Sequence, residues 1–196
     1  MNQDSCNVRQ HILETAKPIL LGKGFSAVGL SEILAAAAVP KGSFYHYFKS
    51  KDAFGEALLE YYFENYITRL DTLFAEDGHS AADRLMRYWQ GWCNSQGCTD
   101  GDGRCLVVKL GGEVCDLSEA MRQALERGTR AVITRLTDCI EQGRADGSLA
   151  GVGDARQMAE SLYQMWLGAT LLAKIRRDET ALDRALLATR RMLALS

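Results

Sequence analysis

The 196-residue chain has few residues that interrupt helices and no long apolar run. Because it contains only 2 prolines, little prevents the formation of long helices. No apolar segment reaches the length of a membrane span, and the first ten residues, MNQDSCNVRQ, lack the charged-then-apolar layout of a signal peptide. We therefore expect a cytoplasmic protein with no membrane-bound part.

Motifs that bind metals or cofactors are also missing. The 6 cysteines are scattered at positions 6, 93, 98, 105, 115 and 139, without a CxxC pair and without Cys/His pairs at zinc spacing. The chain has no GxGxxG loop and no paired acid–base constellation. The sequence therefore predicts no metal site, no cofactor and no enzymatic activity, and we expect free thiols in a reducing compartment.

Helical periodicity is what the chain does have, since no segment alternates as a half-buried strand would. The pattern predicts an all-α fold of about nine helices, the first of them kinked at Pro18. Ser31, Ser50, Ser118 and Asp154 are the expected first residues or N-caps of four of these helices. The predicted helical segments are residues 8–22, 31–38, 41–48, 51–74, 81–94, 104–115, 119–144, 155–176 and 179–195.

The stretch KGSFYHYFKSK, residues 41–51, combines clustered aromatic rings with lysines at both ends. It follows a short predicted helix and a tight connection at Val39-Pro40, an arrangement typical of a helix-turn-helix unit. Phe44 and Phe48 stand four residues apart and share a face that suits a core. The opposite face offers groups that can donate hydrogen bonds to phosphates or base edges of DNA. The same periodicity also fits a buried aromatic cluster without any ligand.

Charge is distributed unevenly along the chain. The formal net charge is −2, but residues 1–51 carry six Lys/Arg and three Asp/Glu, which gives this end a local charge of +3. A basic end on an acidic body suggests that this end meets a polyanion.

Residues 24–54, GFSAVGLSEILAAAAVPKGSFYHYFKSKDAF, resemble the DNA-binding signature of the TetR family of transcriptional regulators. Ala38 departs from the pattern, since the family often has glycine in this turn. The matching positions are Gly24-Phe25, Leu30, Ile33, Ala37, Val39, Gly42, Phe44-Tyr45, Tyr47-Phe48 and Ser50-Lys51.

This resemblance implies a homodimer that binds double-stranded DNA at a near-palindromic operator. Residues 1–51 would be the DNA-binding helix-turn-helix domain, and residues 52–196 would hold the regulatory site and the dimer interface. The implied interface lies on the last two helices, at Gly168, Ala169, Ala173, Leu182, Leu186, Leu187 and Leu193. The DNA contacts that the resemblance implies fall on Ser31, Lys41, Gly42, Ser43, Tyr45, His46, Tyr47 and Lys51.

Cys105 is the cysteine whose local sequence favours reactivity. It follows a glycine-rich loop at the expected start of a helix, with Arg104 beside it and Lys109 one turn further on. A helix N-terminus and neighbouring cations favour the thiolate, so we expect a low-pKa, reactive cysteine. The alternative is a small, buried and inert residue.

The body also resembles the N-ethylmaleimide-reductase repressor branch of the family, in the segments CLVVKL, EVCDLSEAMR and YQMWLGATLLAKIRR. Members of that branch answer to small-molecule electrophiles and oxidants through cysteine, and Cys105 occupies the sensing position. Cys98 could act as a resolving thiol, whereas Cys115 and Cys139 are expected to be buried. Lys174 follows an apolar stripe that would lower its pKa and make it a partner for the oxidised sulfur, unless it merely extends into solvent.

Two alternatives to cysteine-based sensing remain open. In the first, the same fold binds a drug-like molecule noncovalently and the cysteines are passive. The pocket would then be aromatic and formed by Tyr88, Trp89, Trp92, Tyr163 and Trp166. In the second, the protein is a thiol redox enzyme that uses Cys98 and Cys105.

Overall fold

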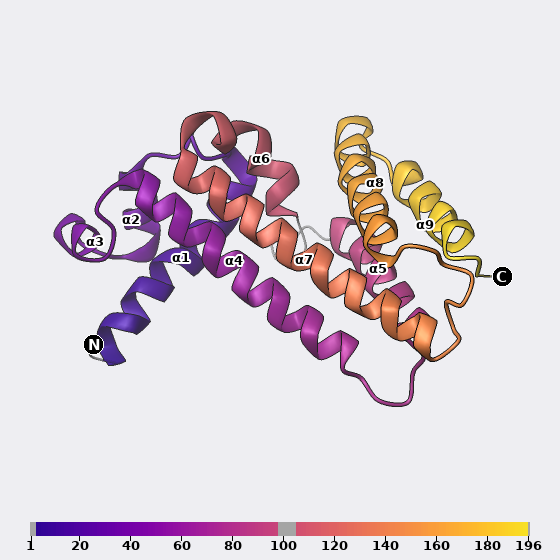
Figure 1. Cartoon of the computed structure of the whole chain (residues 1–196). Coiled ribbons are helices and arrows are strands. Elements are labelled where there is room, and N and C mark those ends of the chain that lie inside the picture. Colours follow the sequence, from indigo (N-terminus) through magenta and orange to yellow (C-terminus); the bar gives the residue numbers. More distant parts are fainter. Residues whose placement is uncertain (1–2, 98–104, 196) are drawn as a thin grey trace. The chain divides into compact units, whose positions relative to one another are not determined.

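The structure is a computed structural model that describes residues 3–97 and 105–195. Over these two ranges the chain forms nine α-helices and no strand, which confirms the predicted all-α fold (Figure 1). Of the helices in these ranges, none is apolar over a length that would cross a membrane. The helices are α1 (Gln3–Lys23), α2 (Leu30–Ala37), α3 (Lys41–Tyr47), α4 (Lys51–Phe74), α5 (Ala81–Gly97), α6 (Leu106–Leu117), α7 (Glu119–Ala145), α8 (Ala155–Arg176) and α9 (Thr180–Met192).

Side-chain caps fix the starts of several helices where the sequence predicts them. The hydroxyl of Ser50 accepts a hydrogen bond from the backbone N–H of Ala53 at the start of α4, at 3.0 Å. The carboxylate of Asp154 accepts one from Gln157 at the start of α8, at 2.8 Å. Each bond satisfies a backbone donor that the first turn of a helix leaves without a partner. Ser118 likewise accepts a longer bond at the start of α7.

The predicted start of α2 is wrong by one residue. The helix begins at Leu30, and its N-cap is Gly29, which offers no side chain for a capping bond. Ser31 therefore lies inside the first turn, where it is exposed. At the other end, α2 stops at Ala38, which has a φ of 53° and so adopts the left-handed conformation. Glycine adopts this conformation without strain, which gives a physical reason for the glycine that the family often has there.

The first compact unit comprises Met1–Glu64 together with Asp100–Gly128. Within it, α1 packs against α2 and α6, and α2 packs against α3. We refer to α1, α2 and α3 as the head. Buried side chains that form the core of this unit include Ile12, Leu20, Ile33, Phe44, Phe54 and Leu110.

The second compact unit comprises Asn65–Thr99 together with Thr129–Ser196. Within it, α9 packs against both α8 and α5. This division differs from the boundary predicted between residues 51 and 52, because the first unit also includes the start of α4 and the whole of α6. The core of the second unit includes Leu85, Trp89, Leu136, Ile140, Leu162 and Trp166.

Candidate functional site

The short helix α3 divides the aromatic stretch between core and surface, as the sequence predicts. Phe44 and Phe48 are buried, and both rings lie against Phe54, with centroids 5.6 and 5.2 Å away. Tyr45, by contrast, is 52% exposed, and His46 is exposed beside it. The reading as a wholly buried aromatic cluster is therefore wrong, because burial stops at the two phenylalanines.

The other residues predicted to contact DNA lie in three different settings. Lys41 and Gly42 are exposed at the start of α3, whereas Ser43 and Tyr47 are half-buried. Lys51 makes contacts within the protein. Its ammonium donates to the backbone oxygen of Phe25 at 2.9 Å and lies 4.7 Å from the centroid of the Phe25 ring. Any contact that Lys51 makes with DNA would therefore compete with a contact that stabilises the head.

Cys105 is the N-cap of α6, as predicted, but its environment does not favour the thiolate. The side chain is only 8% exposed, and this burial raises the pKa of the thiol. Hydrogen bonds from the backbone N–H groups of Val108 and Val107 and from Tyr62 act in the opposite direction and do not outweigh it. The prediction of a low-pKa thiol is therefore wrong for this conformation, because desolvation penalises the charged form.

The structure describes one of the two cations expected to assist Cys105. Arg104 lies outside the described residues, as does the proposed resolving thiol, Cys98. Lys109 directs its ammonium to the backbone oxygen of Gly22, at 3.1 Å.

The remaining described cysteines also differ from one another. Cys139 is buried as predicted, its sulfur lies 3.5 Å from the backbone oxygen of Ala81, and burial raises the pKa of the thiol to about 12. Cys115 is exposed on α6, so the prediction that it is buried is wrong. Its position falls on the solvent side of a helix whose buried side is formed by Leu106, Leu110 and Val114.

Lys174 lies in the last turn of α8 and is exposed in the single chain. The prediction of a desolvated lysine is therefore wrong at the level of one chain. Its neighbours explain this result, because Ile175 is 67% exposed and Leu171 is 47% exposed, and they do not enclose the ammonium. Lys174 belongs to the second compact unit, whereas Cys105 belongs to the first.

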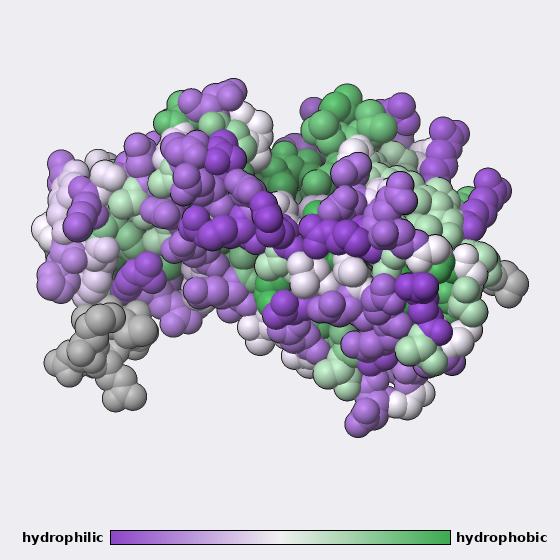
Figure 2. All heavy atoms as spheres, in the orientation of Figure 1, coloured by the Kyte–Doolittle hydropathy of each residue, from purple (hydrophilic) through white to green (hydrophobic). Residues whose placement is uncertain are grey.

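The apolar residues that are exposed on α8 and α9 are not the same set as the residues of the implied dimer interface. Ala169, Leu182 and Leu193 are buried inside the second unit of the single chain. The large apolar side chains that stay exposed on these helices are Leu171, Leu172, Ile175 and Leu187, which we call the α8–α9 apolar face. Apolar surface is visible at the end of α8 in Figure 2.

The five aromatic residues of the alternative pocket do come together, in the second unit. Trp89 and Trp166 are fully buried and stacked, with centroids 4.9 Å apart and an interplanar angle of 11°. Trp92 and Trp166 donate their indole N–H groups to the hydroxyls of Thr170 and Thr189, each at 2.9 Å. The indole N–H of Trp89 has no acceptor among the described residues. The rings contact one another and so form part of the core.

Sequence reasoning missed Glu113, a residue of α6 that binds the connection between α1 and α2. Its carboxylate accepts hydrogen bonds from the backbone N–H groups of Phe25, at 3.0 Å, and Ser26, at 2.5 Å. Burial by itself raises the pKa of Glu113, but bonds from Ser26 and Phe25 and the charge of Lys109 outweigh it, so the pKa lies below its ordinary value. The only signal in the sequence is the spacing of Lys109 and Glu113, which are four residues apart.

Two glycines allow this region to pack closely. Gly24 has a φ of +92°, and a Cβ there would lie 3.0 Å from the carboxylate of Glu113. At Gly55 of α4, a Cβ would overlap the ring of Phe25 and the sulfur of Met121. The connection therefore packs closely against the backbone of α4 at Gly55 and against the carboxylate of Glu113 on α6.

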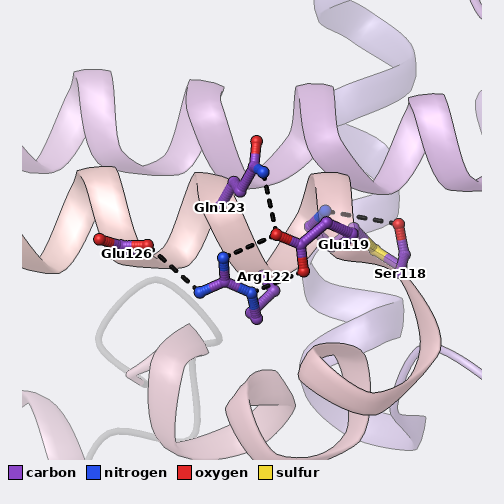
Figure 3. A network of polar contacts seen from close by, with 6 residues as sticks. Ser118, Glu119, Arg122, Gln123 and Glu126 are labelled. Atoms are coloured by element: carbon purple, nitrogen blue, oxygen red, sulfur yellow. Dashed lines mark hydrogen bonds and ion pairs between the residues drawn. The ribbon is translucent and has the colours of Figure 1, made fainter.

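A second polar network lies at the start of α7 and contains no reactive group (Figure 3). Arg122 binds Glu119 through two hydrogen bonds of 2.7 Å and reaches Glu126 at 3.2 Å. Bonds from Arg122 and Gln123 lower the pKa of Glu119 to about 2. Because these side chains are exposed, water screens the ion pairs, and we assign the network no more than a local structural role. The described residues also hold no group of His, Cys, Asp or Glu suited to a metal.

A three-helix head with a buried apolar core and with polar groups exposed on its third helix is typical of a helix-turn-helix DNA-binding protein. A family model described as bacterial regulatory proteins of the tetR family matches residues 12–58, and one described as a tetracyclin repressor-like C-terminal domain matches residues 81–189. The chain belongs to the TetR family of bacterial regulatory proteins.

Individual relatives agree with this assignment. The chain is 45% identical to the HTH-type transcriptional repressor NemR of Escherichia coli K12, over 96% of this chain and 94% of that protein. It is 36% identical to the transcriptional regulator AcuR of Cereibacter sphaeroides, over 88% of this chain and 78% of the relative. A crystal structure of the reduced form of E. coli NemR matches with a TM-score of 0.90 at 44% identity, over 95% of this chain and 96% of that chain.

Proposed function

We propose that this protein is a transcriptional repressor that binds a near-palindromic operator as a homodimer and is released when an electrophile or oxidant modifies Cys105. The observation that carries the proposal is the division of α3, which anchors Phe44 in the core and exposes Tyr45 and His46. The similarity to the NemR repressor over nearly the whole chain supports the same function.

DNA recognition would use the exposed side of α3 in the major groove. Lys41, Tyr45 and His46 can donate to base edges or phosphates, and Gly42 lets the start of the helix approach the groove closely. Two heads would then read half-sites about 34–36 Å apart, which is one turn of DNA.

Dimerisation would cover the α8–α9 apolar face. Four large apolar side chains are exposed on adjacent helices, and their burial against a second copy would remove this surface from water. A dimer would also supply the second head that a palindromic operator needs.

The burial of Cys105 supplies a mechanism for release. With an electrophilic alkene such as N-ethylmaleimide, the Cys105 sulfur forms a C–S bond to one alkene carbon, and the other alkene carbon takes up a proton. A two-electron oxidant instead transfers oxygen to the sulfur and gives a sulfenic acid. Either product is larger than the thiol, and a buried, closely packed position cannot accept added atoms without movement of α6.

Operator binding before and after N-ethylmaleimide treatment tests the proposal. The parent protein should prefer a palindromic operator over random DNA and lose that preference on treatment. Cys105→Ser should bind the operator and ignore treatment, whereas the matched control Cys115→Ser, which removes an exposed thiol of the same helix, should respond as the parent does. Release of Cys105→Ser by the reagent would assign sensing to another residue.

A noncovalent effector is the second candidate, and one observation favours it. The buried indole N–H of Trp89 lacks an acceptor in the described part of the chain, and a ligand oxygen could supply one within the aromatic cluster. In that case an aromatic ligand would release Cys105→Ser and parent protein alike.

A further inference from the structure

The connection between α1 and α2 is where α6 holds the head. Two consecutive backbone N–H groups, those of Phe25 and Ser26, donate to the carboxylate of Glu113. The ammonium of Lys109 donates to the backbone oxygen of Gly22. Glu113 and Lys109 of α6 thus bind two backbone donors and one backbone acceptor within residues 22–26 of the head. Both attachments involve an ionised side chain, but the Glu113 carboxylate accepts two such hydrogen bonds whereas the Lys109 ammonium donates one, so the carboxylate is the stronger of the two attachments.

We infer that Glu113 is a positioning residue for DNA binding: its carboxylate fixes the head on α6, so that a displacement of α6 displaces the recognition helix. The displacement of α6 by modified Cys105 rests on the proposed function, but the fixing of the head by Glu113 does not.

The geometry of α6 explains why Glu113 can transmit a change at Cys105. Cys105, Lys109 and Glu113 follow one another at intervals of four residues, so they lie on one side of the helix. About 12 Å of helix separates the first from the last, at 1.5 Å per residue. A helix keeps its hydrogen-bonded length when it shifts, so a movement at its N-cap reaches the carboxylate without the involvement of another element.

Specific and non-specific DNA binding should respond differently to the loss of this contact. Binding to a palindrome needs both heads at a fixed separation, whereas binding to random DNA depends on cations near phosphates. A head that is released from α6 but still folded should therefore lose operator affinity and keep its affinity for random DNA. If the contact only stabilised the fold, its loss would leave the ratio of operator affinity to random-DNA affinity unchanged.

The experiment compares the reduced parent with Glu113→Gln, Glu113→Ala and the control Glu119→Gln. Glu113→Gln and Glu119→Gln each remove one negative charge from the same unit, but the hydrogen bonds of Glu119 go to Arg122 and Gln123 of its own helix. Operator affinity and random-DNA affinity are measured by fluorescence anisotropy at one salt concentration, and then again after treatment with N-ethylmaleimide.

Glu113→Ala should weaken operator binding about tenfold, within the usual range of coupling between sites. Glu113→Gln should weaken it about threefold, since its remaining oxygen keeps one acceptor. Random-DNA affinity should stay within about twofold of the control, which also verifies that the heads remain folded. In Glu113→Ala, treatment with N-ethylmaleimide should change operator affinity by less than about twofold.

Operator affinities of both Glu113 variants equal to that of Glu119→Gln would overturn the inference. A parent protein that keeps its operator after treatment would instead refute sensing through Cys105, and the untreated affinities would still decide the role of Glu113.

Discussion

At the scale of single residues, the chemistry of Cys105 is set by what surrounds it. Burial raises the pKa of its thiol above the ordinary value, so the thiolate is the minor form at neutral pH. We predict that the alkylation rate of Cys105 by iodoacetamide rises about tenfold per pH unit between about pH 6 and pH 9. Mass analysis of the peptide that contains Cys105 measures the rate.

Tyr62→Phe supplies the control for this pH dependence. It removes a hydrogen bond that favours the thiolate, so alkylation should be slower at each pH while the slope stays the same. A rate that levels off below about pH 8 would show that the thiol has a low pKa in solution.

At the scale of elements, the end of α2 is under local strain. Ala38 adopts a left-handed conformation, which costs a non-glycine residue about 1 kcal/mol. Ala38→Gly should therefore raise the free energy of unfolding by up to about 1 kcal/mol, as measured by urea denaturation followed by circular dichroism. Ala36→Gly is the matched control, since it places glycine inside α2 and should destabilise the protein by a similar amount. Equal effects of both changes would contradict the prediction.

At the scale of the whole molecule, the α8–α9 apolar face should decide the oligomeric state. Ile175→Glu or Leu187→Glu would place an unpaired charge in a buried interface at a cost of about 3 kcal/mol. That cost weakens the dimer about hundredfold, which sedimentation velocity over a concentration series would detect. Leu117→Glu is the control, because it changes an exposed leucine of α6. If all three variants remain dimers, the interface lies elsewhere.

Much of this protein follows from local sequence. The helical periods predict all nine helices seen in residues 3–97 and 105–195, and the caps at Ser50 and Asp154 are found where they are expected. The spacing of Phe44 and Phe48 also predicts which side of α3 enters the core. These features depend on hydrogen bonds and side-chain directions within a few residues, and so the sequence itself determines them.

Only the tertiary structure decides which apolar and polar groups find partners from distant segments. Ala169 and Leu171 lie two residues apart in one apolar run, but packing buries the first and exposes the second. The local sequence around Cys105 favours a thiolate, whereas its burial within the first unit raises the thiol pKa. Glu113 has no distinguishing motif and gains its role from Phe25 and Ser26, 88 and 87 residues away. Burial and desolvation depend on these non-local contacts, which periodicity and local motifs do not encode.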